Sequence, residues 1–323
     1  MLGILLGDTH LRMKTPIRRK EIDFLDVCLG KLRQVCEIAK EYKAPIFQAG
    51  DFFDSPDPSK ELMAAVIELL RKYGCMIYAI HGQHDMAYHS ERSMKRSALR
   101  VLEAAGVVKI LSSEPTIVNG MSVYGANWGQ KPPKPCDDNF NFLVAHDMIG
   151  DKPLYPGHIL DGPSDYAQHY PGYNLILLGD YHYSFSIKVG NTWVINCGAM
   201  LRLNSSTRDL ELAPKVVMFH VVDITSMQDV IKKLTIGSED IFLKVADVED
   251  CFDLSGDKKE SNTKDFIEFV NLLKKTGKAA VNILDNLHTY FNMYNVSEDI
   301  RQVIGEAFDE VREQEQEKGE SNA

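Results

Sequence analysis

The sequence predicts an α/β protein in which two sheets form a sandwich flanked by helices. Apolar runs typical of strands alternate with segments of helical periodicity over residues 2–111. Parallel strands need crossover connections, so this order indicates a largely parallel first sheet. Shorter strands separated by turn residues such as Asn119-Gly120 follow, and they predict a second, partly antiparallel sheet.

The first half of the chain supplies the helices that should cover the first sheet. Residues 18–42 repeat apolar side chains about every 3.6 positions, which is typical of a helix packed on a sheet. A second helix should open at Ser59 and end at Gly74, because glycine is a favoured residue just past a helix. A third helix is expected at residues 92–105. The strands expected around these helices are residues 2–6, 44–48, 76–80 and 107–111.

The second half contains shorter strands and longer loops. Residues 130–139 and 151–172 are rich in Pro and Gly and are expected to be loops. Strands are expected at residues 116–118, 122–124, 142–145, 175–178, 186–189, 193–196 and 215–222.

Three regions are expected along the chain. Residues 1–222 should form the main domain, and residues 223–295 a small α+β cap region with a strand at 241–245. Residues 296–323 should be a helix from Ser297 to Glu317 with a polar tail. The cap region should also contain helices at residues 265–275 and 279–290.

Composition limits the function classes. The formal net charge of −10 argues against a surface that binds nucleic acid as a whole, because Lys and Arg hold backbone phosphates. Any DNA contact should therefore be local. The six cysteines are scattered and include no CxxC pair. No long apolar run and no amino-terminal export signal are found, so we expect a cytoplasmic protein without a membrane segment.

Five acidic and histidine-bearing clusters each follow a run of strand type. The carboxyl ends of strands form the binding crevice of an α/β sheet, so the clusters should converge there. Carboxylates with imidazoles suit divalent cations, and a shared carboxylate, here Asp51, would hold two ions about 3.5–4 Å apart. Such a pair serves phosphoryl transfer, which predicts a phosphate ester as substrate. The clusters are Gly7-Asp8-Thr9-His10, Gly50-Asp51-Phe52-Phe53-Asp54, Gly82-Gln83-His84-Asp85, Ala145-His146-Asp147 and Gly179-Asp180-Tyr181-His182.

The order D-x-H, G-D, G-[N/Q]-H-D, H and G-x-x-H resembles the calcineurin-like metallophosphoesterases over roughly residues 1–200. Within that superfamily, residues 50–54, 82–85 and 196–202 resemble the SbcD-type nuclease subunit of DNA double-strand-break repair complexes, in its bacterial and phage versions. The resemblance implies a metallophosphoesterase sandwich that acts as a metal-dependent DNA exonuclease and endonuclease in repair and recombination. It also implies a homodimer and an ABC-type ATPase partner with a long coiled coil, for which residues 297–317 are the expected contact.

The resemblance assigns roles to the cluster residues. His84 would act at the scissile phosphate without binding metal, and Asp85 would orient it. The first ion would be held by Asp8, His10 and His182, the second by Gln83, His146 and Asp180, and Asp51 would bridge them. Local positive charge in the loop after the first cluster separately indicates DNA contacts, and residues 223–295 would be a cap or DNA-binding domain. The residues expected to contact DNA are Arg12, Lys14, Arg18, Arg19, His89 and Arg202.

Two ligands depart from the superfamily's pattern, which has Asn in place of Gln83 and His in place of Asp180. The ligand set becomes harder and more negative, so we expect two Mn²⁺ ions, with Mg²⁺ as an alternative, in preference to Zn²⁺. With these departures, a second metal site that binds weakly or stays empty remains an alternative.

Several alternatives remain open from the residues alone. His81 is either a satisfied polar residue or a donor behind the ligands, and Asp54 either caps a turn or orients a ligand. The same metal core also serves phosphomonoesterases and protein phosphatases. A protein of another class, a binding scaffold that has lost catalysis, is the third hypothesis.

Overall fold

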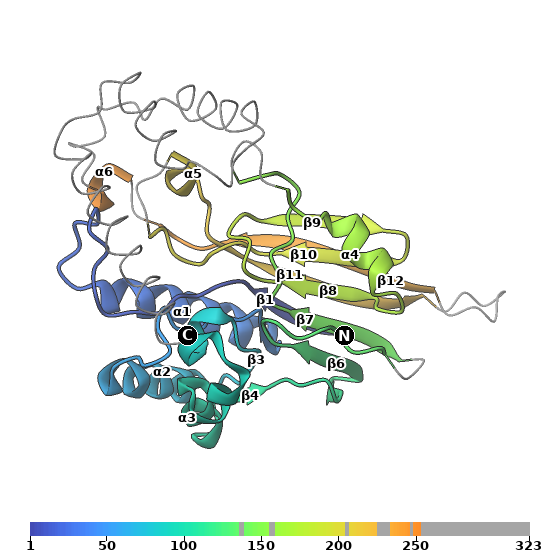
Figure 1. Cartoon of the computed structure of the whole chain (residues 1–323), viewed down its shortest axis with the longest axis horizontal. Helices are drawn as coiled ribbons and strands as arrows, with labels where there is room; N and C mark the ends of the chain where they lie inside the picture. Colours follow the sequence, from blue (N-terminus) through green and yellow to red (C-terminus); the bar gives the residue numbers. More distant parts are fainter. Residues whose placement is uncertain (136–138, 155–158, 204–206, 225–232, 246–247, 253–323) are drawn as a thin grey trace, which may run out of the picture. The chain divides into compact units, whose positions relative to one another are not determined.

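Two six-stranded sheets packed face to face organise the molecule (Figure 1). The structure is a computed structural model that describes residues 1–135, 139–154, 159–203, 207–224, 233–245 and 248–252. These residues confirm the predicted α/β sandwich. No helix within these ranges is long and apolar enough to cross a membrane.

The first sheet has the strand order β12-β11-β1-β2-β3-β4. Its strands are β1 (Leu2–Leu6), β2 (Ile46–Gln48), β3 (Ile77–Ala79), β4 (Val108–Ile110), β11 (Lys215–Ile224) and β12 (Lys233–Phe242). Strands β1 to β4 are parallel, whereas β11 and β12 run antiparallel at the other edge. The crossover helices are α1 (Phe24–Tyr42), α2 (Lys60–Tyr73) and α3 (Ala98–Ala104). The carboxyl ends of β1, β2 and β3 therefore lie at one edge of the sheet.

The second sheet has the order β5-β6-β7-β8-β10-β9. Its strands are β5 (Thr116–Val118), β6 (Met121–Ala126), β7 (Phe140–Ala145), β8 (Leu175–Leu178), β9 (Phe185–Val189) and β10 (Thr192–Asn196). The four inner strands are parallel and the two edge strands pair antiparallel, as the short, turn-bounded segments predicted.

Alternation along the strands separates the layers of the core. Ile4 and Leu6 of β1 pack against the helices, whereas Leu5 between them faces the second sheet. Between the sheets the ring of Phe142 lies 4.8 Å from that of Phe47 and 5.6 Å from that of Phe219, measured between centroids. A third cluster fills the outer face of the second sheet beneath α4 (Pro163–His169).

Some helix bounds differ from the expectation for local reasons. Helix α1 begins at Phe24 rather than residue 18, because the Asp23 carboxylate accepts hydrogen bonds from the backbone of Leu25 and Asp26. Ile22, an apolar residue within the expected range 18–42, lies before the helix and is fully exposed. The helix expected at 92–105 is divided by Ser97, which caps α3, and three 3₁₀ turns precede it at Gln83–Asp85, Ala87–His89 and Glu91–Arg96.

The chain beyond residue 150 also differs in detail. The loop expected at 151–172 contains helix α4. The strand expected at 241–245 shares only its first two residues with β12, which ends at Phe242. The predicted domain boundary at 222 falls inside β11, with which β12 pairs. The helices expected at 265–275, 279–290 and 297–317 lie outside the described residues, and the division into three regions stays a prediction.

The edge-to-face phenylalanine rings between the sheets give a prediction for stability. Phe142→Ala should lower the free energy of unfolding by about 3–5 kcal/mol, because the cavity cannot close between two sheets. Ile117→Ala, in the same sheet but with a side chain that is 63% exposed, should change it by less than about 0.5 kcal/mol. Chemical denaturation of both variants measures the difference, and equal midpoints would contradict the assigned packing.

Candidate metal centre

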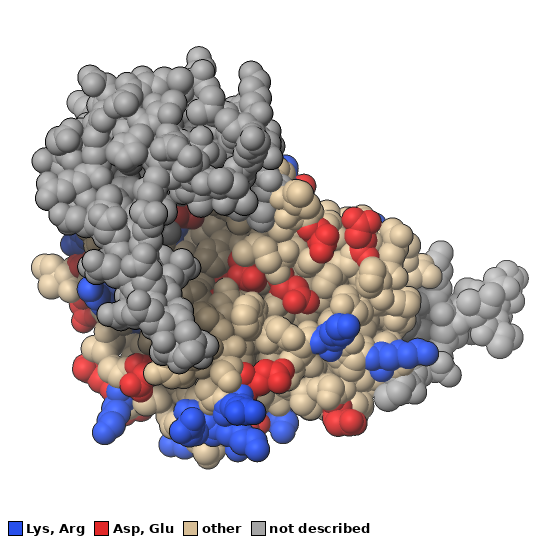
Figure 2. Space-filling model, viewed as in Figure 1, with Lys and Arg blue, Asp and Glu red and all other residues tan. Residues whose placement is uncertain are grey.

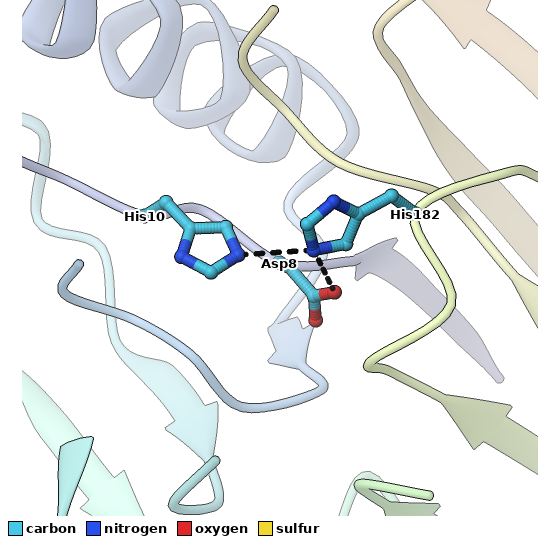
Figure 3. A group of neighbouring side chains, drawn as sticks. All are labelled: Asp8, His10 and His182. Carbon is cyan, nitrogen blue, oxygen red and sulfur yellow. Dashed lines mark hydrogen bonds and ion pairs between the residues drawn. The ribbon is translucent and has the colours of Figure 1, made fainter. Parts of the chain in front are cut away.

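The turns after β1 and β8 bring three predicted ligands together (Figure 3). Nε2 of His10 lies 3.1 Å from Nε2 of His182, which in turn lies 3.5 Å from Oδ2 of Asp8. These ligand atoms all lie within 4.8 Å of one another. Two imidazoles and a carboxylate that converge on one point form a donor set suited to a first-row divalent cation.

The backbone at these turns is unusual. His10, Asp51 and Asp180 all have left-handed φ angles, of 42°, 51° and 73°. Such conformations cost of order 1–3 kcal/mol for a residue other than glycine, and they gather at functional sites. The turn at His10 is held by a 2.9 Å hydrogen bond from its backbone N–H to the carbonyl of Asp51, which ties the first two clusters together.

Glycines in the clusters make room for the ligands. A Cβ on Gly82 would lie 2.1 Å from Oδ1 of Asp51. One on Gly50 or on Gly179 would lie 2.5 Å from Nδ1 of His146. The carboxylate and the imidazole therefore reach their positions only because these three residues lack a side chain.

Asp51 lies at the centre of the site and is fully buried. Its Oδ1 accepts a 2.8 Å hydrogen bond from the backbone of His84, whereas its Oδ2 has no hydrogen-bond donor among the described residues. That oxygen lies 3.5 Å from Nε2 of His146 and 3.9 Å from Nε2 of His10. A buried carboxylate oxygen without a donor is costly, so its surroundings fit a bound cation.

The other half of the site is built around His146. Its Nδ1 lies 2.6 Å from the carbonyl of Ala49, which leaves Nε2 facing Oε1 of Gln83 at 2.7 Å. A hydrogen bond behind the ring is the usual way to orient a ligating histidine. Gln83 in turn donates to Asp180, and the backbone N–H of Asp180 donates to Asp8. All seven predicted ligands thus belong to one connected group.

Burial and charge shift the pKa values of these groups. Burial raises the pKa of Asp8 well above its usual value and lowers that of His10 to about 3, so that its imidazole is neutral, as a ligand must be. Burial alone would raise the pKa of Asp51 and lower that of His146. The attraction between their opposite charges, 3.5 Å apart, outweighs it, lowering the pKa of Asp51 to about 2 and raising that of His146 to about 10.

His84 stands at the open side of the cluster, with 42% of its side chain exposed. Its Nδ1 lies 3.1 Å from the carbonyl of Asp54, and its Nε2 lies 4.0 Å from Oδ2 of Asp51. Both carboxylate oxygens of Asp85 accept from the backbone, which differs from the predicted role of orienting this ring. The buried carboxylate accepts three backbone hydrogen bonds of 3.0–3.1 Å from Gly82, Phe52 and Phe53.

Asp54 contributes more to the site than the sequence indicated. Its Oδ1 lies 3.6 Å from Nδ1 of His10, and its Oδ2 lies 2.9 Å from Nη1 of Arg12. A carboxylate behind a ligating imidazole fixes the ring, so the orienting alternative for Asp54 is favoured. Arg12, which was expected to contact DNA, pairs with Asp54 instead. The sequence signal for this orienting role was that Asp54 lies within the second cluster.

Of the residues expected to contact DNA, Arg19 and Arg202 form contacts within the protein. Arg19 forms a buried ion pair with Glu21, and its guanidinium lies between the rings of Phe24 and Phe252. Arg202 donates from Nε to the carbonyl of Leu212 at 2.7 Å, and its own carbonyl accepts from Arg19. The guanidinium of Arg19 is therefore buried against protein groups, which corrects its assignment to the substrate. Arg202 is half-buried, and its contact with DNA stays a prediction. Lys14 is exposed and Arg18 is half-buried.

Two histidines near the site have separate roles. His89 lies against the loop that carries Gln83, with Nδ1 3.2 Å from the carbonyl of that residue, and its ring packs near Trp128. His81 is buried and satisfied, because its ring nitrogens lie 3.1 Å from Oδ1 of Asn127 and 2.8 Å from Oγ of Ser97. The structure therefore favours the first alternative for His81, a satisfied polar residue.

Comparison with known families agrees with this site. The sequence profile of the calcineurin-like phosphoesterases matches residues 4–184, which contain all five clusters. The chain belongs to the calcineurin-like phosphoesterase family. It therefore carries a metallophosphoesterase domain, the class of fold and chemistry to which the convergent ligands point.

Two curated relatives of this calcineurin-like phosphoesterase are DNA double-strand break repair proteins Mre11. The one from Halobacterium salinarum is 27% identical over 218 residues, covering 63% of this chain and 52% of the relative. The one from Methanosarcina mazei is 24% identical over 219 residues, covering 63% and 34%. The chain thus spans about half the length of the first and a third of the second.

Among solved structures, a 5′-nucleotidase precursor from Thermus thermophilus superposes with a TM-score of 0.43 and 12% identity. The superposition covers 75% of this calcineurin-like phosphoesterase and 54% of the nucleotidase. A score this low adds nothing to the assignment, which depends on the family profile and on the ligand geometry.

The close approach of Gly82 to Asp51 yields a prediction. Gly82→Ala should weaken Mn²⁺ binding by about 10-fold or more, because the added methyl displaces the central carboxylate. Gly30→Ala is the matched control, since a Cβ there meets nothing within 4 Å and helix α1 should gain about 0.5–1 kcal/mol. Calorimetric titration of both variants tests this, and unchanged binding by Gly82→Ala would show that the carboxylate is not needed there.

Proposed function

We propose that the chain is a metal-dependent DNA nuclease that hydrolyses phosphodiester bonds, with two Mn²⁺ ions or, alternatively, Mg²⁺. The observation that carries this proposal is the buried oxygen Oδ2 of Asp51, which lacks a donor among the described residues and faces imidazoles from two sides. The similarity to DNA double-strand break repair proteins supports DNA as the substrate.

Each half of the site would hold one cation. Asp8, His10 and His182 would hold the first, His146 and Gln83 the second, and Asp51 would be shared. Bound cations would polarise the phosphate and acidify a water molecule. The exposed His84 keeps Nδ1 on the Asp54 carbonyl and turns Nε2 toward the cluster, where it can give a proton to the leaving oxygen.

The surface next to His84 suits a nucleic acid. Four residues further on, Tyr88 is 98% exposed and has a left-handed φ of 54°. Arg92, Lys95 and Arg96 follow along the same segment. Basic side chains gather at the lower edge of the view in Figure 2, where Figure 1 labels α3. An aromatic ring can stack on an unpaired base while neighbouring cations hold phosphates, which provides a local contact on an acidic chain.

The proposal also includes the protein partners and the cellular process. We place the chain in DNA repair and recombination in the cytoplasm, as a homodimer that works with a coiled-coil ATPase of the ABC type. The similarity to repair proteins supports this context. The expected ATPase contact, residues 297–317, lies outside the described residues.

Substrate choice provides the first test. With Mn²⁺ the chain should cleave plasmid and hairpin DNA, and His84→Ala should reduce the rate by about 100-fold or more with Mn²⁺ affinity unchanged, because a proton donor is lost. Cleavage of p-nitrophenyl phosphate with DNA left intact would instead indicate a phosphomonoesterase. A chain that turns over neither substrate would support the scaffold hypothesis.

The basic surface gives a second test. Changing Arg92, Lys95 and Arg96 to Glu should raise KM for DNA, because three phosphate contacts are lost. For the same reason, KM should depend less steeply on salt concentration. The control changes Lys40, Lys43 and Lys72 to Glu, an equal change in charge at the ends of α1 and α2. Steady-state kinetics at several salt concentrations separates the two, and equal effects would mean that only net charge matters.

A further inference from the structure

The side-chain amide of Gln83 is held at both ends. Its Nε2 donates a 2.8 Å hydrogen bond to Oδ1 of Asp180, and its Oε1 lies 2.7 Å from Nε2 of His146. An amide can approach a carboxylate only with its NH₂ end, because two oxygens that both accept would repel each other. Asp180 therefore decides which end of the amide faces His146.

Asp180 itself is fixed by its backbone. Its φ is 73°, and its N–H donates to both carboxylate oxygens of Asp8, at 3.3 and 3.0 Å. Its Oδ1 accepts the 2.8 Å hydrogen bond from Nε2 of Gln83. The carboxylate of Asp180 is thus directed at the amide of Gln83.

We propose that Asp180 is a positioning residue and not a ligand of the second cation. It holds Gln83 so that Oε1 points, with Nε2 of His146 and Oδ2 of Asp51, to the place of that cation. This inference rests on the proposed two-cation function. The second cation then has three protein ligands, whereas the first has Asp8, His10, His182 and the shared Asp51.

Unequal ligand sets should give unequal affinities. The cation with four protein ligands should bind first, and the second should bind in a separate, weaker step. Loss of Asp180 should act on the second step alone, because without its partner the amide of Gln83 turns freely and presents Oε1 only part of the time.

The test is a thermodynamic cycle on the full chain, freed of metal and titrated with Mn²⁺ in a calorimeter. Asp180→Ala should weaken the second step by about 10-fold or more when Gln83 is present, the usual effect of removing an outer partner of a ligand. In the Gln83→Ala background, Asp180→Ala should weaken the second step by less than about 3-fold, because Asp180 acts on this step only through Gln83. The first step is the internal control and should not move.

A crystal structure grown with Mn²⁺ provides the direct readout. Anomalous density should place the Asp180 oxygens on the Gln83 amide and outside the coordination sphere of either ion. Equal losses of affinity in the two backgrounds, or an Asp180 oxygen bonded to Mn²⁺, would overturn the inference.

Neither measurement uses a substrate. A chain that binds Mn²⁺ in the expected coupled manner but cleaves no DNA would retain this role for Asp180 while disproving the nuclease. A chain that cleaves DNA but in which Asp180 binds Mn²⁺ directly would support the nuclease and disprove the positioning role of Asp180.

Discussion

The arrangement depends on one buried carboxylate oxygen. Oδ2 of Asp51 is shut off from water and has no hydrogen-bond donor in the described part of the chain, while imidazoles approach it from two sides. Such an atom is tolerated only where positive charge balances it. The left-handed turn at His10 and the glycines that make room for Asp51 and His146 let two imidazoles come within 3.9 Å of that oxygen.

The architecture was largely predictable because it follows from periodicity. Apolar runs identify β1 to β3, and the rule that the carboxyl ends of parallel strands share an edge brings the first three clusters together. The last two clusters follow β7 and β8 of the second sheet, and the packing of the two sheets brings them to the same place. Helix ends were less predictable. The start of α1 is set by the Asp23 carboxylate, a local hydrogen bond that competes with an apolar pattern reaching back to residue 18.

The candidate ligands were predictable from residue type and order, whereas their supporting contacts were not. Asp54 and Asp85 both stand within the clusters, yet one faces an imidazole and the other accepts backbone N–H groups. Arg19 and Arg202 look like surface cations in the sequence, but their guanidiniums bind protein groups. Side-chain direction after a turn depends on tertiary contacts, which a linear pattern does not contain.

The pairing of β11 with β1 has a consequence for biosynthesis. Strand β1 is translated long before β11, so one of its edges gains a neighbour only when residues 215–224 have been made. Until then an apolar strand with unpaired amides persists, which is a hazard for aggregation in a nascent chain. The same delay means that no partial product carries a finished centre, since His182 and the Met200 amide that binds the Asp8 carbonyl arrive late.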